Sequence, residues 1–273
     1  MITLAEIAVY PVKSCRGIAL ESASLTASGL EWDRHWMFVD GAGTFVSQRT
    51  RPQLARVATR FTRTGVELRA PGLEPLTLPF AATGERVAVR IWKDACDVLD
   101  QGDAAAGWAS EATGERVRVV RAAQVTQRHA NAEFAGPTPA PMAFADGYPV
   151  LVCNRASLAE LNTRMPEPIP MGRFRPNLVL DGLEPFAEDD VDSIAVGDAV
   201  LRLVKPCTRC VVTSTDQLSG ERAANPLPVL RKFRFDRELL GVKFGENAVV
   251  ERGVGAVLRR GAEVKPSRLS KTV

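Results

Sequence analysis

The chain has 273 residues, of which 45% are hydrophobic and 25% are charged, and its net charge is only +3. This charge is too small to predict nucleic-acid binding, and no apolar stretch approaches the ~20 residues that a membrane helix needs. The first residues alternate like a strand without a basic segment before an apolar core, so we expect no signal peptide and a cytoplasmic protein. The five cysteines are odd in number and scattered, unlike a secreted disulfide framework.

The first third of the chain alternates apolar and polar residues in short runs that Gly and Pro interrupt. Such runs predict half-buried strands at residues 6–12, 35–40, 45–50, 54–61, 66–70, 76–80 and 86–92. Seven runs in this space indicate an antiparallel barrel or sandwich. The first helix is predicted at residues 102–113, and a strand follows at 116–123.

The second half begins with an irregular segment. Residues 124–146 are rich in Pro and Ala and lack periodicity, which predicts a long loop. A helix is predicted at 155–165, with Asn154 or Ser157 as its N-cap, and a short helix at 226–235. Strands are predicted at residues 148–154, 173–182, 194–207, 210–215, 247–253 and 256–266. The fold class is therefore predicted to be α+β and β-rich, with a barrel as its core.

The segment KPCTRC places Cys207 and Cys210 three positions apart. A redox dithiol of this spacing opens a helix, whereas the following VVTST predicts a strand. A structural zinc site needs two further ligands nearby, and His35 and His129 are the only histidines. Two interpretations stay open at this point: a pair of small buried residues, or one thiolate ligand of a soft metal that a cofactor also holds.

Basic residues elsewhere suit an anionic ligand. In YPVKSCRG, Lys13 and Ser14 lie at a turn and offer a charge and a hydroxyl to a phosphate, although such a pair is also common on surfaces. Arg34 lies among aromatic residues, on which it could simply stack. In GRFRPN, Arg173 and Arg175 are predicted on one face of a strand, and arginine binds phosphate with two hydrogen bonds. An anionic metal cofactor would need these groups to converge on the thiol.

Six blocks in order carry a family resemblance: YPVKSCRG, DRHWMFVD, FADGYPVLVCNRASLAELN, RFRPNLVL, KPCTRCVVTSTD and KFGENAVV. Over nearly the whole chain the sequence resembles MOSC-domain proteins with an N-terminal MOSC β-barrel domain. These are relatives of the mitochondrial amidoxime-reducing component and of bacterial proteins that reduce N-hydroxylated compounds. The resemblance implies a MOSC-type β-barrel at residues 122–273 and a β-barrel-like N-terminal domain at 1–121, whose Lys13 and Arg34 region contributes to the cofactor site.

The resemblance also implies a molybdenum cofactor, in which Cys210 is the metal ligand and a catalytic residue. Asp146, the second catalytic residue, and Gly147 match the segment that lines the open side of the metal. Cofactor-binding positions carried over by motif are Lys13, Ser14, Arg34, Gly147, Arg175, Asn177, Thr208, Arg209 and Asn247. At Asn247 relatives also carry an aromatic residue, and Cys207 is expected to be a neighbour without a ligand role. The superfamily is further associated with pyridoxal phosphate binding.

The activity implied is reduction of small N-hydroxylated or N-oxide compounds. No cysteine follows Cys210, so the cysteine cluster of a fused ferredoxin is missing, and we expect electrons from a separate donor protein such as a ferredoxin or flavin reductase. Because the chain begins directly in a strand, we expect no membrane anchor. Two alternatives are a sulfur carrier that acts through a persulfide on Cys207 or Cys210, and a cofactor carrier without turnover.

Overall fold

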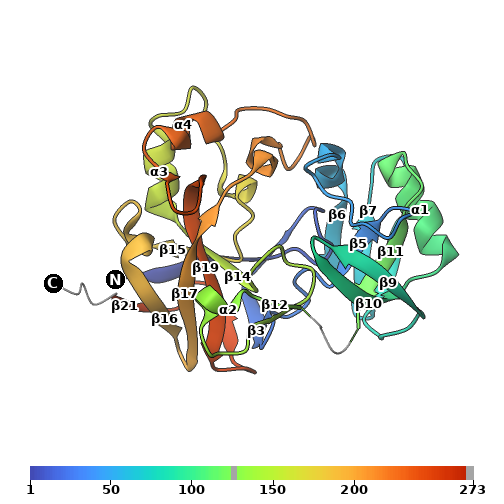
Figure 1. The fold of residues 1–273 in the computed structure, drawn as a ribbon, viewed down its shortest axis with the longest axis horizontal. Coiled ribbons are helices and arrows are strands. Elements are labelled where there is room, and N and C mark those ends of the chain that lie inside the picture. The colour runs from blue at the N-terminus through green and yellow to red at the C-terminus, as the bar shows by residue number, and fades with distance from the viewer. Residues whose placement is uncertain (124–127, 269–273) are drawn as a thin grey trace.

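The structure, a computed structural model, describes residues 1–123 and 128–268. Two β-rich bodies lie side by side, with the C-terminal strands in one and most of the first 122 residues in the other (Figure 1). The β-rich α+β class predicted from the sequence is confirmed. Within the described ranges no helix is both long and apolar enough to cross a membrane.

The larger body is built on a nine-stranded sheet with the order β2-β1-β15-β14-β19-β17-β16-β21, and β18 pairs with β19. All of its pairs are antiparallel except β14 with β15. Its strands are β1 (Thr3–Val9), β2 (Ile18–Leu20), β14 (Val150–Asn154), β15 (Leu178–Asp181), β16 (Val191–Val196), β17 (Ala199–Thr208), β18 (Phe235–Asp236), β19 (Gly241–Arg252) and β21 (Lys265–Arg268). This pairing brings β1 and β2, from the start of the chain, among strands of the second half.

The start of β1 lies beside the residues that lead into β21, which gives the larger body its barrel-like form. The amide of Leu4 donates to the Ala262 carbonyl at 2.9 Å, and the amide of Val264 donates to the Ile2 carbonyl at 2.9 Å. A further sheet, β20 (Val257–Arg259), β3 (Ser22–Thr26) and β4 (Gly29–Leu30), lies on the same core. Inward-facing residues of all these strands form that core, among them Leu4, Ile7, Val152, Leu180, Ile194, Leu201, Ala248 and Leu258. Period-2 alternation therefore places the apolar faces inside.

In the described ranges the smaller body contains two sheets, one α-helix and the 3₁₀ helix η1 (Pro52–Arg56). The first sheet has the order β5 (Trp36–Val39), β11 (Arg118–Ala122), β10 (Asp94–Asp100) and β9 (Glu85–Ile91). The second is β6 (Ala58–Phe61), β7 (Gly65–Arg69) and β8 (Leu76–Pro79). Helix α1 (Asp103–Thr113) packs against β11 of the first sheet and β8 of the second. Ala105 and Ala109 on α1 share a core with Trp36 and Phe38. Small helix residues thus allow close approach to large strand residues.

The predicted boundary at 121/122 stays a prediction, and backbone pairing crosses it. Strand β1 pairs with β15, and β3 pairs with β20. Strands β1, β2, β3 and β4 consequently pack within the larger body, whereas Val12 and Cys15, in the turn after β1, belong to the core of the smaller body. The chain passes into the smaller body for good near Trp36.

Most predicted elements of the first half are present, but two predictions differ from the structure. The strand predicted at 54–61 begins only at Ala58, because Pro52–Arg56 form a 3₁₀ helix. Residues 45–50 do not form a strand, and Phe45 makes only an isolated bridge to Val39. The reason is local, because the Ser47 carbonyl accepts the amide of Arg51 at 2.9 Å and turns the chain. The sequence did not predict strands β2, β3, β4 and β10.

In the second half both predicted helices are found, as α3 (Arg155–Asn162) and α4 (Leu227–Arg231). Asn154 caps α3, since its side chain accepts a hydrogen bond from the Ala156 amide at 3.1 Å. The segment predicted as a loop holds the short elements β12 (Arg128–His129), α2 (Ala132–Ala135) and β13 (Pro141–Met142), while residues 124–127 lie outside the described residues. Residues 256–266 divide into β20 and the approach to β21.

Two strand predictions next to the site are wrong. Residues Val211–Ser214 form a 3₁₀ turn that Cys210 begins, because the Thr213 amide bonds back to the Cys210 carbonyl at 3.1 Å. Arg173 also ends a 3₁₀ turn, and Arg175 has a left-handed backbone with φ of 57°, so strand β15 starts only at Leu178. Arg173 and Arg175 therefore do not share the face of a strand.

Candidate functional site

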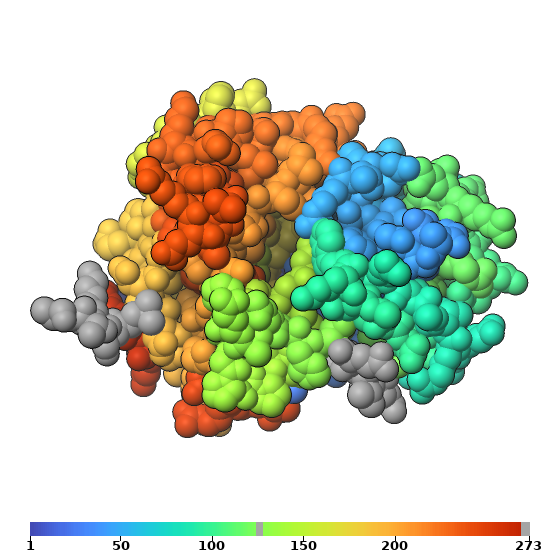
Figure 2. All heavy atoms as spheres, viewed as in Figure 1, coloured from blue at the N-terminus to red at the C-terminus, as the bar shows by residue number. Residues whose placement is uncertain are grey.

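A pocket of about 490 Å³ lies between the two bodies, and we call it the central pocket. Figure 2 shows it as a hollow between the orange C-terminal segments and the blue and teal N-terminal ones. Every site residue that the family resemblance implied lines it, together with Cys207: Lys13, Ser14, Arg34, Asp146, Gly147, Arg175, Asn177, Thr208, Arg209, Cys210 and Asn247. The fold thus gathers residues spread over more than 200 positions.

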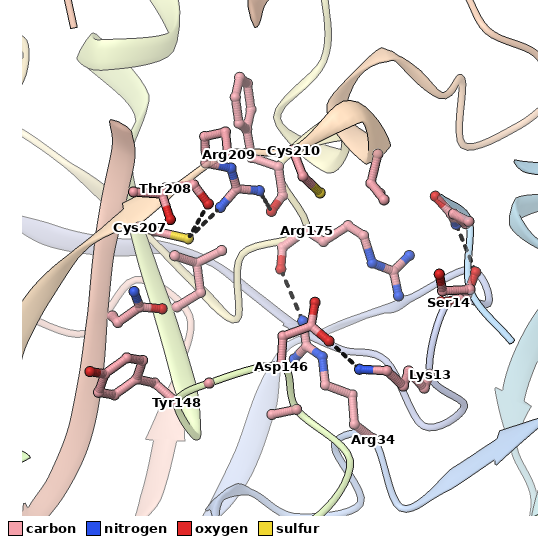
Figure 3. A pocket seen from close by; sticks show the side chains of 18 of the residues that line it. Lys13, Ser14, Arg34, Asp146, Tyr148, Arg175, Cys207, Thr208, Arg209 and Cys210 are labelled. Atoms are coloured by element: carbon pink, nitrogen blue, oxygen red, sulfur yellow. Dashed lines mark hydrogen bonds and ion pairs between the residues drawn. The ribbon is translucent and has the colours of Figure 1, made fainter. Parts of the chain in front are cut away.

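Lys13 and Asp146 form an ion pair on the floor of the central pocket (Figure 3). The Lys13 side chain is buried, and its Nζ also donates to the Phe144 carbonyl at 2.8 Å. Arg49 adds a second cation, with its Nη2 3.3 Å from Asp146 Oδ2. The Asp146 side chain remains 54% exposed, so it faces the pocket while two cations hold it.

The charges around Asp146 decide its protonation. Although burial acts in the opposite direction, Lys13 and Arg49 hold the pKa of Asp146 well below its usual range. The site therefore contains a carboxylate, and not a carboxylic acid, at neutral pH.

Arg34 and Arg175 lie against the same aromatic ring. Their Cζ atoms are 4.7 Å and 4.2 Å from the centre of the Tyr10 ring. Arg34 donates to Asn177 Oδ1 at 3.2 Å, and Arg175 donates to the Cys15 carbonyl at 2.7 Å. Burial lowers the pKa of Arg175 to about 10, and the nearby charge of Arg34 contributes, but Arg175 stays cationic at neutral pH. Two guanidinium groups are thus fixed side by side at the pocket wall.

The backbone is strained at this wall. Seven non-glycine residues in the described ranges have positive φ, and four of them line the central pocket: Ser14, Arg34, Trp92 and Arg175. Positive φ costs on the order of 1 kcal/mol per residue outside glycine. This clustering indicates that side-chain placement in the pocket outweighs local conformational preference.

The cysteine segment leaves β17 and enters the 3₁₀ turn at the upper side of the pocket (Figure 3). The Arg209 amide bonds to the Val242 carbonyl at 2.8 Å, and Arg209 Nη1 lies 2.8 Å from Cys207 Sγ. Burial raises the pKa of Cys207, and Arg209 opposes that shift. Both thiols are free and half-buried. Cys207 is therefore engaged by a neighbouring guanidinium, whereas Cys210 lies at the start of the turn.

The side chains that line the central pocket suit an anionic cofactor with polar groups at its edges. Among the described residues, six cationic side chains line the central pocket against the single carboxylate of Asp146: Lys13, Arg34, Arg49, Arg175, Lys205 and Arg209. Arg209 Nε and Tyr148 Oη are buried and find no hydrogen-bond partner among the described residues. Buried polar atoms normally have partners, so these two atoms suit hydrogen bonds to a polar cofactor. The described part of the chain also has no cluster of three metal-binding side chains, so a metal here would take most of its ligands from the cofactor.

Sequence reasoning missed several lining residues: Arg49, Trp92, Tyr148 and Lys205. Three consecutive polar residues at 47–49 were the available signal for Arg49, since they break the alternation of a strand. Arg173 is not in the lining and instead pairs with Asp216 at 3.2 Å. Asn247 lies opposite Lys205 in the pairing of β19 with β17, which explains why both reach the pocket.

Comparison with known proteins agrees with this architecture. Residues 1–116 match the MOSC N-terminal beta barrel domain, and residues 139–265 match the MOSC domain. The chain therefore belongs to the MOSC-domain proteins that carry the MOSC N-terminal domain.

Among individual relatives, the chain is similar to mitochondrial amidoxime-reducing components. It is 32% identical over 242 residues to component 2 of Bos taurus, covering 85% of this chain and 72% of that protein. It is 31% identical over 266 residues to component 1 of Homo sapiens, covering 91% and 79%. It is also 30% identical over 248 residues to the molybdenum cofactor sulfurase of Drosophila mojavensis, covering 88% of this chain but 31% of that protein.

Proposed function

We propose that this protein is a molybdenum-cofactor-dependent reductase of small N-hydroxylated or N-oxide compounds. The observation that carries the proposal is the half-buried thiol of Cys210 in a pocket where six cationic side chains meet one carboxylate. A soft thiolate suits molybdenum, and the cations suit the phosphate of its pterin. The similarity to amidoxime-reducing components supports the same reaction class.

In this proposal Cys210 is the protein ligand of the metal. Lys13, Ser14, Arg34, Arg175 and Arg209 would bind the phosphate and pterin edges by charge-assisted hydrogen bonds. Asn177, Thr208, Asn247 and the backbone at Gly147 would complete the polar contacts. When bound, the cofactor supplies the oxygen-atom and electron transfer.

Asp146 would orient the substrate. Reduction of R–NHOH to R–NH₂ consumes two electrons and two protons and releases one water. Because its pKa is low, Asp146 cannot donate those protons at neutral pH, but its half-exposed carboxylate can accept the N–H or O–H of a substrate. Burial raises the pKa of Tyr148 to about 12, so this neutral hydroxyl remains a hydrogen-bond donor in the pocket.

The remaining requirement is a source of electrons. We propose a separate donor protein, such as a ferredoxin or a flavin reductase, and a cytoplasmic reaction. A Schiff base with pyridoxal phosphate needs a free lysine. Of the two lysines in the pocket lining, Lys13 is held by Asp146 and the Phe144 carbonyl, which leaves Lys205 for that role.

The decisive experiment is metal analysis. The protein is purified from cells competent in molybdenum-cofactor synthesis, and molybdenum and pterin per chain are measured for wild type, Cys210→Ala and Cys207→Ala. We expect loss of molybdenum from Cys210→Ala only. Wild-type protein without molybdenum contradicts the proposal, and loss in Cys207→Ala alone assigns the ligand to the other cysteine.

Turnover separates an enzyme from a cofactor carrier. The loaded protein is supplied with an amidoxime and an artificial electron donor, and formation of the amidine is measured. Absence of product from fully loaded protein, with a hydroxylamine tested as well, favours the carrier.

A sulfur carrier is a second candidate, and one contact favours it. Arg209 Nη1 lies 2.8 Å from Cys207 Sγ, where a guanidinium would stabilise a thiolate or persulfide. Persulfide labelling of freshly purified wild type and Cys207→Ser tests this role. The label must appear in wild type and vanish in the variant for the candidate to stand.

A further inference from the structure

A second cavity of about 640 Å³ lies beside the first sheet of the smaller body, and we call it the Arg121 cavity. It shares no lining residue with the central pocket. The turn at residues 32–35 separates the two, since Arg34 lines the central pocket whereas Trp32 and His35 line the Arg121 cavity. The rest of its wall is formed by Phe80, Arg121, Pro141 and the small residues of 26–28, 81–82 and 122–123.

Arg121 is the unusual member of this wall. It lies on β11, is only 6% exposed, and its buried Nε and Nη1 find no hydrogen-bond partner among the described residues. Its Cζ lies 5.6 Å and 5.3 Å from the ring centres of Trp32 and Trp36. Stacking on the two indole rings offsets part of the desolvation cost of the buried cation. The N–H donors in the guanidinium plane still have no hydrogen-bond partner from this stacking.

The remaining wall is uncharged and mostly apolar. Trp32 and Phe80 contact each other with ring centres 4.5 Å apart. Burial lowers the pKa of His35, so this ring is neutral at neutral pH. The hydroxyls of Thr26 and Ser28 lie 3.1 Å apart at the rim. Among the described residues that line the cavity, Arg121 is therefore the one charged group, and it carries a single positive charge.

We propose that the Arg121 cavity binds a small monoanion with a flat apolar body, of the class of aromatic carboxylates. The guanidinium fork would bind the carboxylate through two N–H donors, and the aromatic and alanine wall would cover the ring. A volume of about 640 Å³ admits a ligand of this size. The proposal is independent of the reaction in the central pocket.

Benzoate is the probe, and isothermal titration calorimetry on the full cofactor-loaded chain is the measurement. Benzamide is the neutral counterpart. We expect one benzoate site per chain and binding of benzamide that is weaker by about tenfold or more, because a charge-assisted pair is lost. Bound benzoate also raises the melting temperature by mass action.

Variants distinguish the two pockets. Arg121→Met removes the charge and keeps the stem, and Ala82→Phe blocks the cavity from an exposed position without touching Arg121. Both should weaken benzoate binding by about tenfold or more. Lys205→Met is the matched control, since it removes a cation from the central pocket and should leave binding unchanged.

Three results would overturn the proposal: no saturable benzoate binding to wild type, unchanged binding to both cavity variants, or loss of binding in Lys205→Met. If Arg121→Met does not fold, as judged by thermal unfolding, Ala82→Phe decides the question alone. Arg121→Lys refines a positive result, because it keeps the charge and loses the bidentate fork.

Discussion

The ammonium group of Lys13 contacts the carboxylate of Asp146, which lies 133 positions further along the chain. The two partners are unequally exposed, because the Lys13 side chain is 6% exposed and that of Asp146 is 54% exposed. Lys13 therefore depends on Asp146 for compensation of a buried charge, whereas Asp146 also has Arg49 and solvent.

Because Lys13 is buried and depends on Asp146, we expect Asp146→Asn to lower the free energy of unfolding. Loss of one partner of a buried ion pair costs about 3–5 kcal/mol, and solvent access to Asp146 reduces this to about 1–3 kcal/mol. The free energy of unfolding in urea measures the change. Asp181→Asn is the control, since its pair with Arg155 is exposed on both sides and should contribute under about 1 kcal/mol.

The same pair predicts a dependence on pH. Because the pKa of Asp146 is lower in the folded chain than the ~3.9 of free aspartate, its contribution is fully present above about pH 5. It is lost as the pH falls through the folded pKa. The difference between wild type and Asp146→Asn should therefore be constant from pH 5 to 7 and shrink below about pH 4. A constant difference down to pH 3 contradicts the ion pair as its origin.

Glu246 changes the stability with pH in the opposite direction to Asp146. It is 4% exposed, its Oε1 has no partner among the described residues, and burial raises its pKa to about 9, helped by Asp189. The folded chain thus holds a proton that the unfolded chain releases above about pH 4.3, so wild-type stability falls as the pH rises toward 9.

Glu246→Gln removes this penalty while keeping the shape of the side chain. We expect the variant to be more stable than wild type at pH 8 by on the order of 2 kcal/mol, with the gain vanishing near pH 4. Urea unfolding at several pH values measures it. A loss of stability that is the same at pH 5 and pH 8 contradicts the titration.

Gly245 on β19 has φ of 74°, and a Cβ there would lie 2.6 Å from Cys153 Sγ and 2.7 Å from the Val152 carbonyl oxygen. Gly255 has φ of 92° with no atom within 4 Å of such a Cβ. Gly245→Ala should therefore cost at least about 2 kcal/mol more than Gly255→Ala, because both are strained but only one clashes. Equal melting temperatures for the two variants would show that the packing relaxes.

Cysteine alkylation reports the pocket without any assay of activity. Cys15 and Cys153 are fully buried, and burial raises the pKa of Cys15 to about 12. In native protein stripped of cofactor, iodoacetamide should react at Cys207 and Cys210 and spare the other three until the chain is unfolded, as mass spectrometry can show. Cofactor-loaded protein should protect Cys210, and equal labelling of Cys210 with and without cofactor argues against its ligand role.

Signals within a few residues of the sequence were enough to predict several elements of secondary structure. The alanine-rich run of α1 and the Asn154 cap of α3 predict their helices because both signals act within a few residues. The strand β15 was misplaced at its start, since Arg175 adopts a left-handed backbone that its own propensity does not favour. Tertiary contacts with Tyr10 and Cys15 hold it there.

In the candidate site, too, the sequence predicted some features and tertiary contacts decided the others. Residue types and motif order nominated Lys13, Arg34, Asp146, Arg175 and Cys210, because thiols, carboxylates and guanidinium groups carry the same chemistry wherever they lie. Their convergence required the long-range pairing of β1 with β15 and of β17 with β19, and sequence spacing contains no measure of that closeness.

By itself the sequence determined the family, the β-rich class and the chemical inventory of the central pocket, since these depend on residue types and local patterns. Only the tertiary structure decided that Arg49 and Lys205 join that pocket, that Asp146 is held as a carboxylate, and that Arg121 is buried without a partner. The physical reason is that charge compensation and burial are set by neighbours in space, which β-pairing draws from distant parts of the chain.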